Sequence, residues 1–371
     1  MSRFRFIAVA AVLVGVFALA LAACGGDDDD NGGGGGGDSS SGGGGGSIAL
    51  LLPESKTARY ESQDRPNFEK KVKELCSDCD IIYSNADQDA AKQQQQAEAA
   101  ITKGAKVLVL DPVDAASAGA IVNRAKQSQI PVVSYDRLIT DADVDYYISF
   151  DNEKVGQLQG DSLVKKLQDD GKKGSIVMIN GAPTDNNAKL FKEGAHSVID
   201  GSDFKVAKEY DTPDWSPDKA QQEMEQAITA LGKGGFVGVY AANDGTAGGA
   251  IAAMKGNGID PKSIPTTGQD AELAAIQRIL AGEQYMTVYK AIKPEAEQAA
   301  ELAVALAKGD EPPAAEDKVD NGMKQVPSIL LQPVAVTVDN IKDTIVKDEF
   351  WSVDEICTGK YAAACKKAGI Q

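Results

Sequence analysis

Charged and amide side chains follow several apolar runs of this sequence directly. They are Asp111, Asp136, Arg137, Asn243, Asp244, Gln269 and Asp270, with Asp185 and Asn187 after a further run. If the runs are parallel strands, their carboxyl ends lie at one edge of a sheet, which is where such sheets bind ligands. Any single one of these residues is equally well explained as a helix cap or turn residue. As a set, they predict charge-assisted hydrogen bonds to a neutral polyol, with no catalytic step.

Other chemistries lack their residues. The segment 171–175 does not have the spacing of a phosphate-binding loop, and no GxGxxG follows the first apolar run. The one His of the chain, His196, stands in the middle of a predicted helix, so neither a His-rich metal site nor a Ser-His-Asp triad is expected. The 55 acidic against 38 basic residues give a net charge of -17, which argues against nucleic acid as a partner. No metal or cofactor is predicted.

Two series of short apolar runs must position these side chains. The predicted strands are 48–52, 81–83, 107–110, 132–135 and 147–150, then 175–179, 206–210, 237–241 and 266–268. Amphipathic helices are predicted between them at 66–76, 90–103 and 115–129, then 187–199, 218–231, 246–257 and 271–281. Unbroken apolar strands that alternate with helices indicate parallel sheets covered on both faces. The interrupted pattern favours an α/β protein with two doubly wound, parallel-sheet lobes.

The first 47 residues have a different composition. Arg3 and Arg5 precede an apolar run at 7–21, as in a secretion signal, and small residues then lead to Cys24. This order resembles the bacterial lipoprotein cleavage box, which implies a signal peptide at 1–23 and lipidation of Cys24. An ordinary signal peptide that happens to carry a Cys is the alternative. Residues 25–47 contain only Gly, Asp, Ser and Asn, so 24–47 is predicted to be a lipidated Cys with a flexible linker.

Four further cysteines remain in the exported part of the chain. An even number in an oxidising compartment favours disulfides, and the local pairs Cys76–Cys79 and Cys357–Cys365 are the simplest of three connectivities. The CxxC spacing of the first pair also occurs in redox sites and in zinc half-sites. No second CxxC and no nearby His completes a zinc site here.

Six ordered stretches carry a family resemblance. They are Tyr135–Arg137, Tyr147–Gly156, Asp185–Phe191, Asn243–Ala250, Gly268–Ala271 and Met286–Lys290. From about residue 48 to 350 the chain resembles periplasmic sugar-binding proteins of ABC importers, specifically the D-xylose-binding branch. The resemblance implies the type I periplasmic binding protein fold, in which three strand crossings join two lobes. We expect the first lobe at 48–150 and 290–332, and the second at 151–289 and 333–371 with a Cys-containing tail.

The resemblance also implies a ligand set that draws on both lobes. Its members are Arg59, Tyr60, Asp136, Arg137, Asp185, Asn187, Trp215, Asn243, Asp270 and Lys290. Trp215 and Tyr60 are expected to stack on opposite faces of a sugar ring, although Tyr60 replaces the Trp of the xylose-binding branch. Other roles remain open: Trp215 as a surface loop anchor, Lys290 as a simple salt-bridge partner, and Asp136 and Arg137 as partners of each other alone.

The sequence therefore predicts a monomeric extracytoplasmic receptor, tethered by lipid to the outer face of the bacterial cell membrane. It would capture D-xylose or a close relative by hinge closure and deliver it to an ABC permease. Two alternatives stay open: a sugar sensor that reports to a chemoreceptor or kinase, and a secreted sugar-converting enzyme. A transcriptional repressor core shares the fold but would carry a helix-turn-helix and no export signal.

Overall fold

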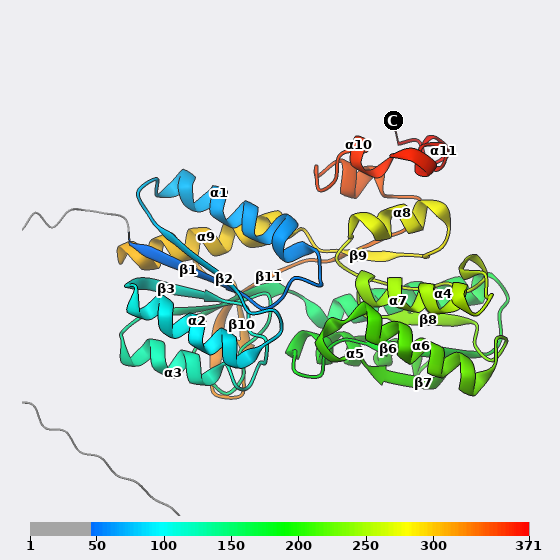
Figure 1. The fold of residues 1–371 in the computed structure, drawn as a ribbon, viewed down its shortest axis with the longest axis horizontal. Helices are drawn as coiled ribbons and strands as arrows, with labels where there is room; N and C mark the ends of the chain where they lie inside the picture. Colours follow the sequence, from blue (N-terminus) through cyan, green and yellow to red (C-terminus); the bar gives the residue numbers. More distant parts are fainter. Residues whose placement is uncertain (1–45, 371) are drawn as a thin grey trace, which may run out of the picture. The chain divides into compact units, whose positions relative to one another are not determined.

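The computed structural model describes residues 46–370, and a mainly parallel seven-stranded sheet organises the first lobe (Figure 1). The strand order is β10-β11-β5-β4-β3-β1-β2, with β10 antiparallel at the edge and all other pairs parallel. The strands are β1 (Ser47–Leu52), β2 (Ile81–Asn85), β3 (Ala105–Leu110), β4 (Val132–Tyr135), β5 (Tyr146–Phe150), β10 (Asp317–Asp320) and β11 (Gln325–Leu331).

Helices cover both faces of this sheet. They are α1 (Arg65–Leu75) and α9 (Ile292–Lys308) on one face, and α2 (Ala90–Thr102) and α3 (Gly119–Gln127) on the other (Figure 1). The central strand β1 shows why: Ile48 and Leu50 pack in the core under α1 and α9, while Ala49 and Leu51 pack in the core under α2 and α3. Because successive side chains of a strand point to opposite faces, an unbroken apolar strand needs cover on both sides.

The second lobe repeats this design on a smaller sheet, with order β7-β6-β8 and all pairs parallel. Its strands are β6 (Ser175–Asn180), β7 (Lys205–Asp211) and β8 (Gly238–Ala241), and its helices are α4 (Asn152–Asp169), α5 (Asn186–Ile199), α6 (Pro217–Leu231), α7 (Asp244–Gly256) and α8 (Leu273–Ala281). Helices α4 and α5 approach closely at Gly156, where an added Cβ would lie 2.0 Å from the Phe191 carbonyl oxygen. This contact fixes the helix that carries two of the predicted ligand residues, Asp185 at its N-cap and Asn187 in its first turn.

The chain passes between the two sheets three times. It leaves β5 for α4, returns through β9 (Thr287–Tyr289) into α9, and leaves β11 again for β12 (Val334–Val336). Strands β9 and β12 pair antiparallel in a sheet of their own. Such short, paired segments between two packed bodies are where hinge motions are absorbed.

The C-terminal segment packs against α8. Helices α10 (Val353–Ile356) and α11 (Ala362–Lys367) are joined by the disulfide Cys357–Cys365, and Ile356 and Cys365 share an apolar cluster with Ile276 of α8. The Trp351 indole also donates to the Ala271 carbonyl at 2.8 Å. The second disulfide, Cys76–Cys79, closes the turn after α1.

The structure corrects the predicted elements at three points. The strand expected at 266–268 is absent, since this segment forms only an isolated bridge between Val239 and Thr266. The helix expected at 115–129 begins only at Gly119, after a loop. The antiparallel edge strand β10 adds to a sheet expected to be parallel throughout, because the alternating polar residues of Asp317–Asp320 gave no apolar run to read.

Candidate functional site

A cavity between the two lobes gathers all ten side chains predicted as ligands. About 250 Å³ of space not occupied by protein atoms lies within it, part of which is open to solvent. It is lined by Thr57, Arg59, Tyr60, Asp136, Arg137, Asp185, Asn187, Phe191, Trp215, Asn243, Gln269, Asp270 and Lys290. The structure thus brings the family-derived ligand set together and adds Thr57, Phe191 and Gln269 to it, whereas Asp111 and Asp244 of the strand-end set do not line the cavity.

Strand ends and helix starts hold the polar residues at this cavity. Asp136 and Arg137 follow β4 immediately, and Lys290 follows β9. Asp185 accepts a hydrogen bond from the Asn187 amide at 2.8 Å as the N-cap of α5, and Asn243 forms a capping box at the start of α7. Asp185 and Asn243 are thus helix caps as well as cavity residues, because the start of a helix after a strand lies at the carboxyl edge of the sheet.

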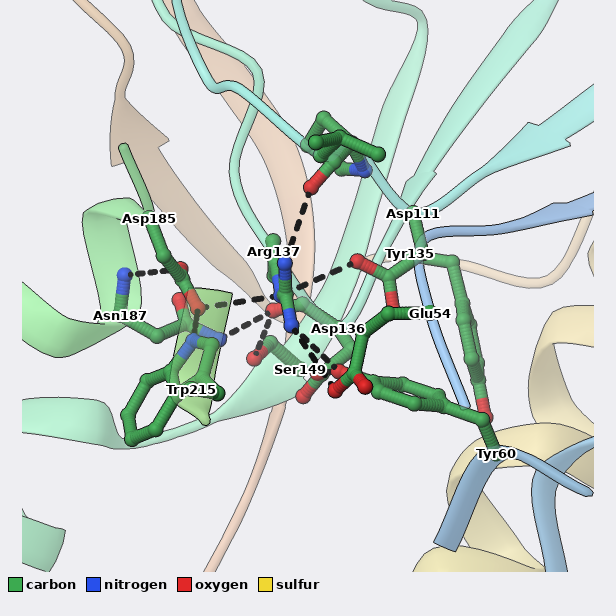
Figure 2. Close-up of polar contacts among 12 residues, drawn as sticks. Glu54, Tyr60, Asp111, Tyr135, Asp136, Arg137, Ser149, Asp185, Asn187 and Trp215 are labelled. Carbon is green, nitrogen blue, oxygen red and sulfur yellow. Dashed lines mark hydrogen bonds and ion pairs between the residues drawn. The ribbon is translucent and has the colours of Figure 1, made fainter. Parts of the chain in front are cut away.

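The first-lobe wall is a network of charges. Arg59 Nη1 donates to Asp136 Oδ1 at 3.0 Å. The Tyr60 hydroxyl donates to Asp136 Oδ2 at 3.0 Å (Figure 2). The same hydroxyl accepts from Arg137 Nη2 at 3.1 Å. Burial alone would raise the pKa of Asp136, but three cations around it, chiefly Arg59, outweigh burial and lower this pKa to about 2. Asp136 is therefore an ionised acceptor.

Direct contacts join the two walls. Arg137 Nε lies 3.0 Å from Asp185 Oδ2 in the second lobe, and Asn187 Nδ2 donates to the Asp136 carbonyl oxygen at 2.9 Å (Figure 2). Burial raises the pKa of Asp185, although the Arg137 charge opposes that rise. Asp136 and Arg137 thus have protein partners other than each other, on both walls of the cavity.

Lys290 sits where the hinge meets the cavity. Its Nζ lies 3.0 Å from Asp270 Oδ1 and 3.8 Å from Asp136 Oδ1, and its side chain is almost fully buried. Lys290 Nζ also lies 5.7 Å from the ring centre of Phe191, within the range of a cation–π contact. The salt bridge foreseen for Lys290 is present, and it lies inside the cavity lining.

The second-lobe wall supplies an aromatic face and unpaired amide groups. Trp215 is 3% exposed, and its indole donates to Asp185 Oδ2 at 3.0 Å, so it is no surface anchor. Gly181 makes room for the ring, because a Cβ there would lie 2.0 Å from a Trp215 ring carbon. Among residues 46–370, the buried Asn243 Nδ2 and Gln269 Oε1 have no hydrogen-bond partner. Buried polar atoms without partners are costly, so these two are well suited to ligand hydroxyl groups.

The residues that sequence reasoning missed differ in how visible they were. Phe191 stands four positions after Asn187 on α5, and this spacing places both on one face of the helix. Gln269 was not missed altogether, because the strand-end pattern already names it beside Asp270, but it is absent from the family-derived ligand set. Thr57 lies in an irregular loop, 53–59, where no periodic pattern marks a side chain as inward-facing. In the part of the chain that the structure describes, no cluster of three metal-ligating side chains is found.

Comparison with known proteins agrees with this geometry. The model of the family described as "Periplasmic binding protein domain" matches residues 48–311. The D-xylose-binding periplasmic protein of Escherichia coli (strain K12) is 42% identical over 313 residues, covering 83% of this chain and 92% of that protein. The multiple sugar-binding periplasmic receptor ChvE of Rhizobium radiobacter is 34% identical over 328 residues, covering 84% and 92%.

Solved structures show the same architecture. An ABC transporter solute-binding protein from Clostridium phytofermentans, solved with bound β-D-glucose, superposes with a TM-score of 0.76 at 31% identity, covering 84% of this chain and 99% of that one. The fold and the cavity define a solute-binding protein and not an enzyme. The chain belongs to the periplasmic binding protein family and has the type I fold of that family, which confirms the predicted fold class.

Proposed function

We propose that this chain captures D-xylose or a closely related monosaccharide between its lobes and delivers it to an ABC permease. The observation that carries the proposal is the cavity itself, which is lined by ten residues expected from the sugar-binding resemblance. The names of the relatives add support, since the protein at 42% identity is a D-xylose-binding periplasmic protein.

The chemistry of the lining suits a sugar. Ionised Asp136 and the guanidinium groups of Arg59 and Arg137 offer charge-assisted hydrogen bonds to hydroxyl groups. The Trp215 ring offers an apolar face for the C–H side of a pyranose, and Tyr60 lines the same cavity.

Hinge closure supplies the coupling between capture and delivery. A ligand that contacts both walls stabilises the closed arrangement over an open one by its differential affinity. The lobes also meet at the rim, where the Ala115 amide donates to the Thr184 carbonyl oxygen at 2.9 Å. The closed pair of lobes then presents a composite surface that a permease distinguishes from the open form.

We place this receptor outside the cytoplasm, tethered to the membrane through a lipid on Cys24, and acting as a monomer. The signal peptide at 1–23, the lipidation site at Cys24 and most of the linker at 24–47 lie outside the described residues, so this part rests on the sequence pattern. Among residues 46–370, no helix combines the length and apolar character needed to cross a membrane.

A sensor that reports the same sugar to a chemoreceptor or kinase would use the same cavity and differ only in its partner. Binding of the purified receptor to a reconstituted permease, with and without sugar, separates the two roles.

Isothermal titration calorimetry against xylose, glucose, galactose, arabinose and ribose tests the proposal. We expect binding of xylose or a near relative at micromolar affinity or tighter, which is about -8 kcal/mol or more favourable. Recovery of the bound sugar unchanged after long incubation is the expected companion result. Flat heats for all five sugars, or turnover of the bound sugar, would overturn the proposal.

A further inference from the structure

The cavity residue Arg59 uses almost all of its hydrogen-bonding capacity on its own lobe. Its Nε donates to Asp64 Oδ2 at 2.9 Å, and its Nη2 donates to both Asp64 Oδ1 and Glu295 Oε2 at 2.6 Å. Its Nη1 donates to Asp136 Oδ1 at 3.0 Å. A guanidinium group carries five N–H donors. These four bonds leave one N–H, and it belongs to Nη1, the nitrogen nearest the second lobe.

That remaining N–H lies on the side of the second-lobe wall. Nη1 is 3.9 Å from Asp270 Oδ1, which is too long for a hydrogen bond, and both residues line the cavity. A sugar hydroxyl in the cavity would therefore find one free donor on Arg59, in a direction fixed by the other four bonds. A planar, five-donor group that is held at its other nitrogens is pre-organised for this contact.

The two carboxylates behind Arg59 are buried and come from distant parts of the chain. Asp64 is 1% exposed and ends the short helical turn η1 (Tyr60–Asp64), and Glu295 is 0% exposed in the first turn of α9. The Tyr135 hydroxyl donates to Asp64 in turn. Because α9 begins directly after the hinge residue Lys290, Glu295 ties Arg59 to the same segment that carries the chain back between the lobes.

We propose that Asp64 and Glu295 are positioning residues for sugar binding, which aim the last free N–H of Arg59 at one hydroxyl of the ligand. The inference rests on the proposed function, because it assigns a role within that same cavity. It differs from a merely structural role for the two carboxylates, which would leave the recognition of individual hydroxyl groups unchanged when they are altered.

The two carboxylates are expected to respond differently to amide substitution. Burial raises the pKa of Glu295 well above its usual range, although the Arg59 charge opposes the rise. Only Oε2 of Glu295 accepts from Arg59, so Glu295→Gln keeps that acceptor. Asp64→Asn replaces one of the two oxygens that receive Arg59 with an NH₂ group, which cannot accept from a guanidinium.

The experiment combines protein variants with deoxy sugars. Calorimetry measures the affinity of wild type, Asp64→Asn, Glu295→Gln, Glu295→Leu and Arg59→Met for xylose and for each of its deoxy analogues. In the wild type, one deoxy analogue lacks the hydroxyl that contacts Arg59. We expect this analogue to bind about tenfold more weakly than the loss of the other contacts of that hydroxyl explains. In Arg59→Met that particular penalty should vanish.

We expect Asp64→Asn and Glu295→Leu to weaken xylose binding about tenfold to a hundredfold and to abolish the penalty at the same hydroxyl. Glu295→Gln should change affinity less than about threefold. The matched control is Glu301→Gln on the same helix, because its ion pair with Lys71 at 2.9 Å joins α9 to α1 and neither residue lines the cavity. It should leave the affinities and the pattern unchanged.

The outcomes separate the inference from the function on which it rests. If wild type binds no sugar, the proposed function fails. If wild type binds xylose and the deoxy pattern of Asp64→Asn and Glu295→Leu equals that of wild type, only the positioning role fails. Should those two variants not fold, Tyr135→Phe provides the test, because it removes only the tyrosine hydroxyl that donates to Asp64. A smaller loss of affinity for the deoxy sugar that lacks the Arg59-bound hydroxyl supports the inference. The same loss as in wild type overturns it.

Discussion

The surroundings of the two cavity arginines differ in a way that the lobe arrangement explains. Arg59 is bonded at every nitrogen by carboxylates of the first lobe, at distances of 2.6 to 3.0 Å. Arg137 comes from the same lobe, but its ion pair at 3.0 Å is with Asp185 of the second lobe. Its own-lobe carboxylates, Glu54 and Asp111, lie 3.8 and 3.6 Å away (Figure 2). Arg59 is thus held within the first lobe, whereas the shortest ion pair of Arg137 bridges the two lobes.

The comparison predicts that Arg59 contributes more than Arg137 to the free energy of unfolding without sugar. Arg59→Met leaves Asp64 and Asp136 buried without their main counter-charge, which should cost about 3–5 kcal/mol of unfolding free energy. Arg137→Met should lower the sugar-free stability clearly less, because its shortest ion pair is with the other lobe and its own-lobe carboxylates lie 3.6 and 3.8 Å away. Urea unfolding without sugar measures both. Equal losses for the two variants would break the comparison.

Trp215→Ala should have the largest effect on affinity with the least effect on the fold. The ring lines the cavity against Gly181 and packs edge-on to Phe191 at 6.3 Å between ring centres. Its loss removes the apolar face for the sugar and about 2–3 kcal/mol of binding free energy. Calorimetry should show this while far-UV circular dichroism stays unchanged. Phe236→Leu, in the core behind β8, is a suitable control, since it should lower stability without changing affinity.

The low pKa of Asp136 predicts a stability that depends on acid. A carboxyl whose pKa falls to about 2 in the folded protein, below its usual 3.8, is stabilising above the unfolded pKa. That contribution should be lost as the pH falls from about 5 to 2 and is worth about 2 kcal/mol. The stability difference between wild type and Asp136→Asn should therefore shrink over this window. A difference that stays constant with pH would show that Asp136 is not held ionised by Arg59.

Asp185→Asn should loosen closure. The substitution removes the charge that Arg137 meets across the cavity and leaves one side-chain oxygen, so either the Trp215 indole or the Asn187 amide loses its acceptor. We expect a loss of about 1–2 kcal/mol in sugar affinity, mostly through faster release, and a sugar-free stability about 1–2 kcal/mol below wild type. Stopped-flow release rates measure it. A slower association with unchanged release would contradict the role of Arg137 as a closing contact.

The amino-acid sequence carries much of this site but not all of it. Strand ends such as that before Asp136 were visible as apolar runs, and the family resemblance supplied Trp215 and Lys290, which no local pattern would select. The buried partners Asp64 and Glu295 were invisible, because each stands in an ordinary polar helix start and meets Arg59 only through tertiary packing. The edge strand β10 was not predicted either, because its mostly exposed and charged residues form no apolar run that indicates a strand.

Crystal diffraction of the protein grown with D-xylose tests the central claim most directly. The account predicts one sugar ring in the cavity, with hydroxyl contacts to Arg59 Nη1 and Asp136 from the first lobe and to Asn243 from the second, and with its apolar face on Trp215. A cavity without sugar at saturating xylose, or a sugar that touches one lobe alone, would contradict it.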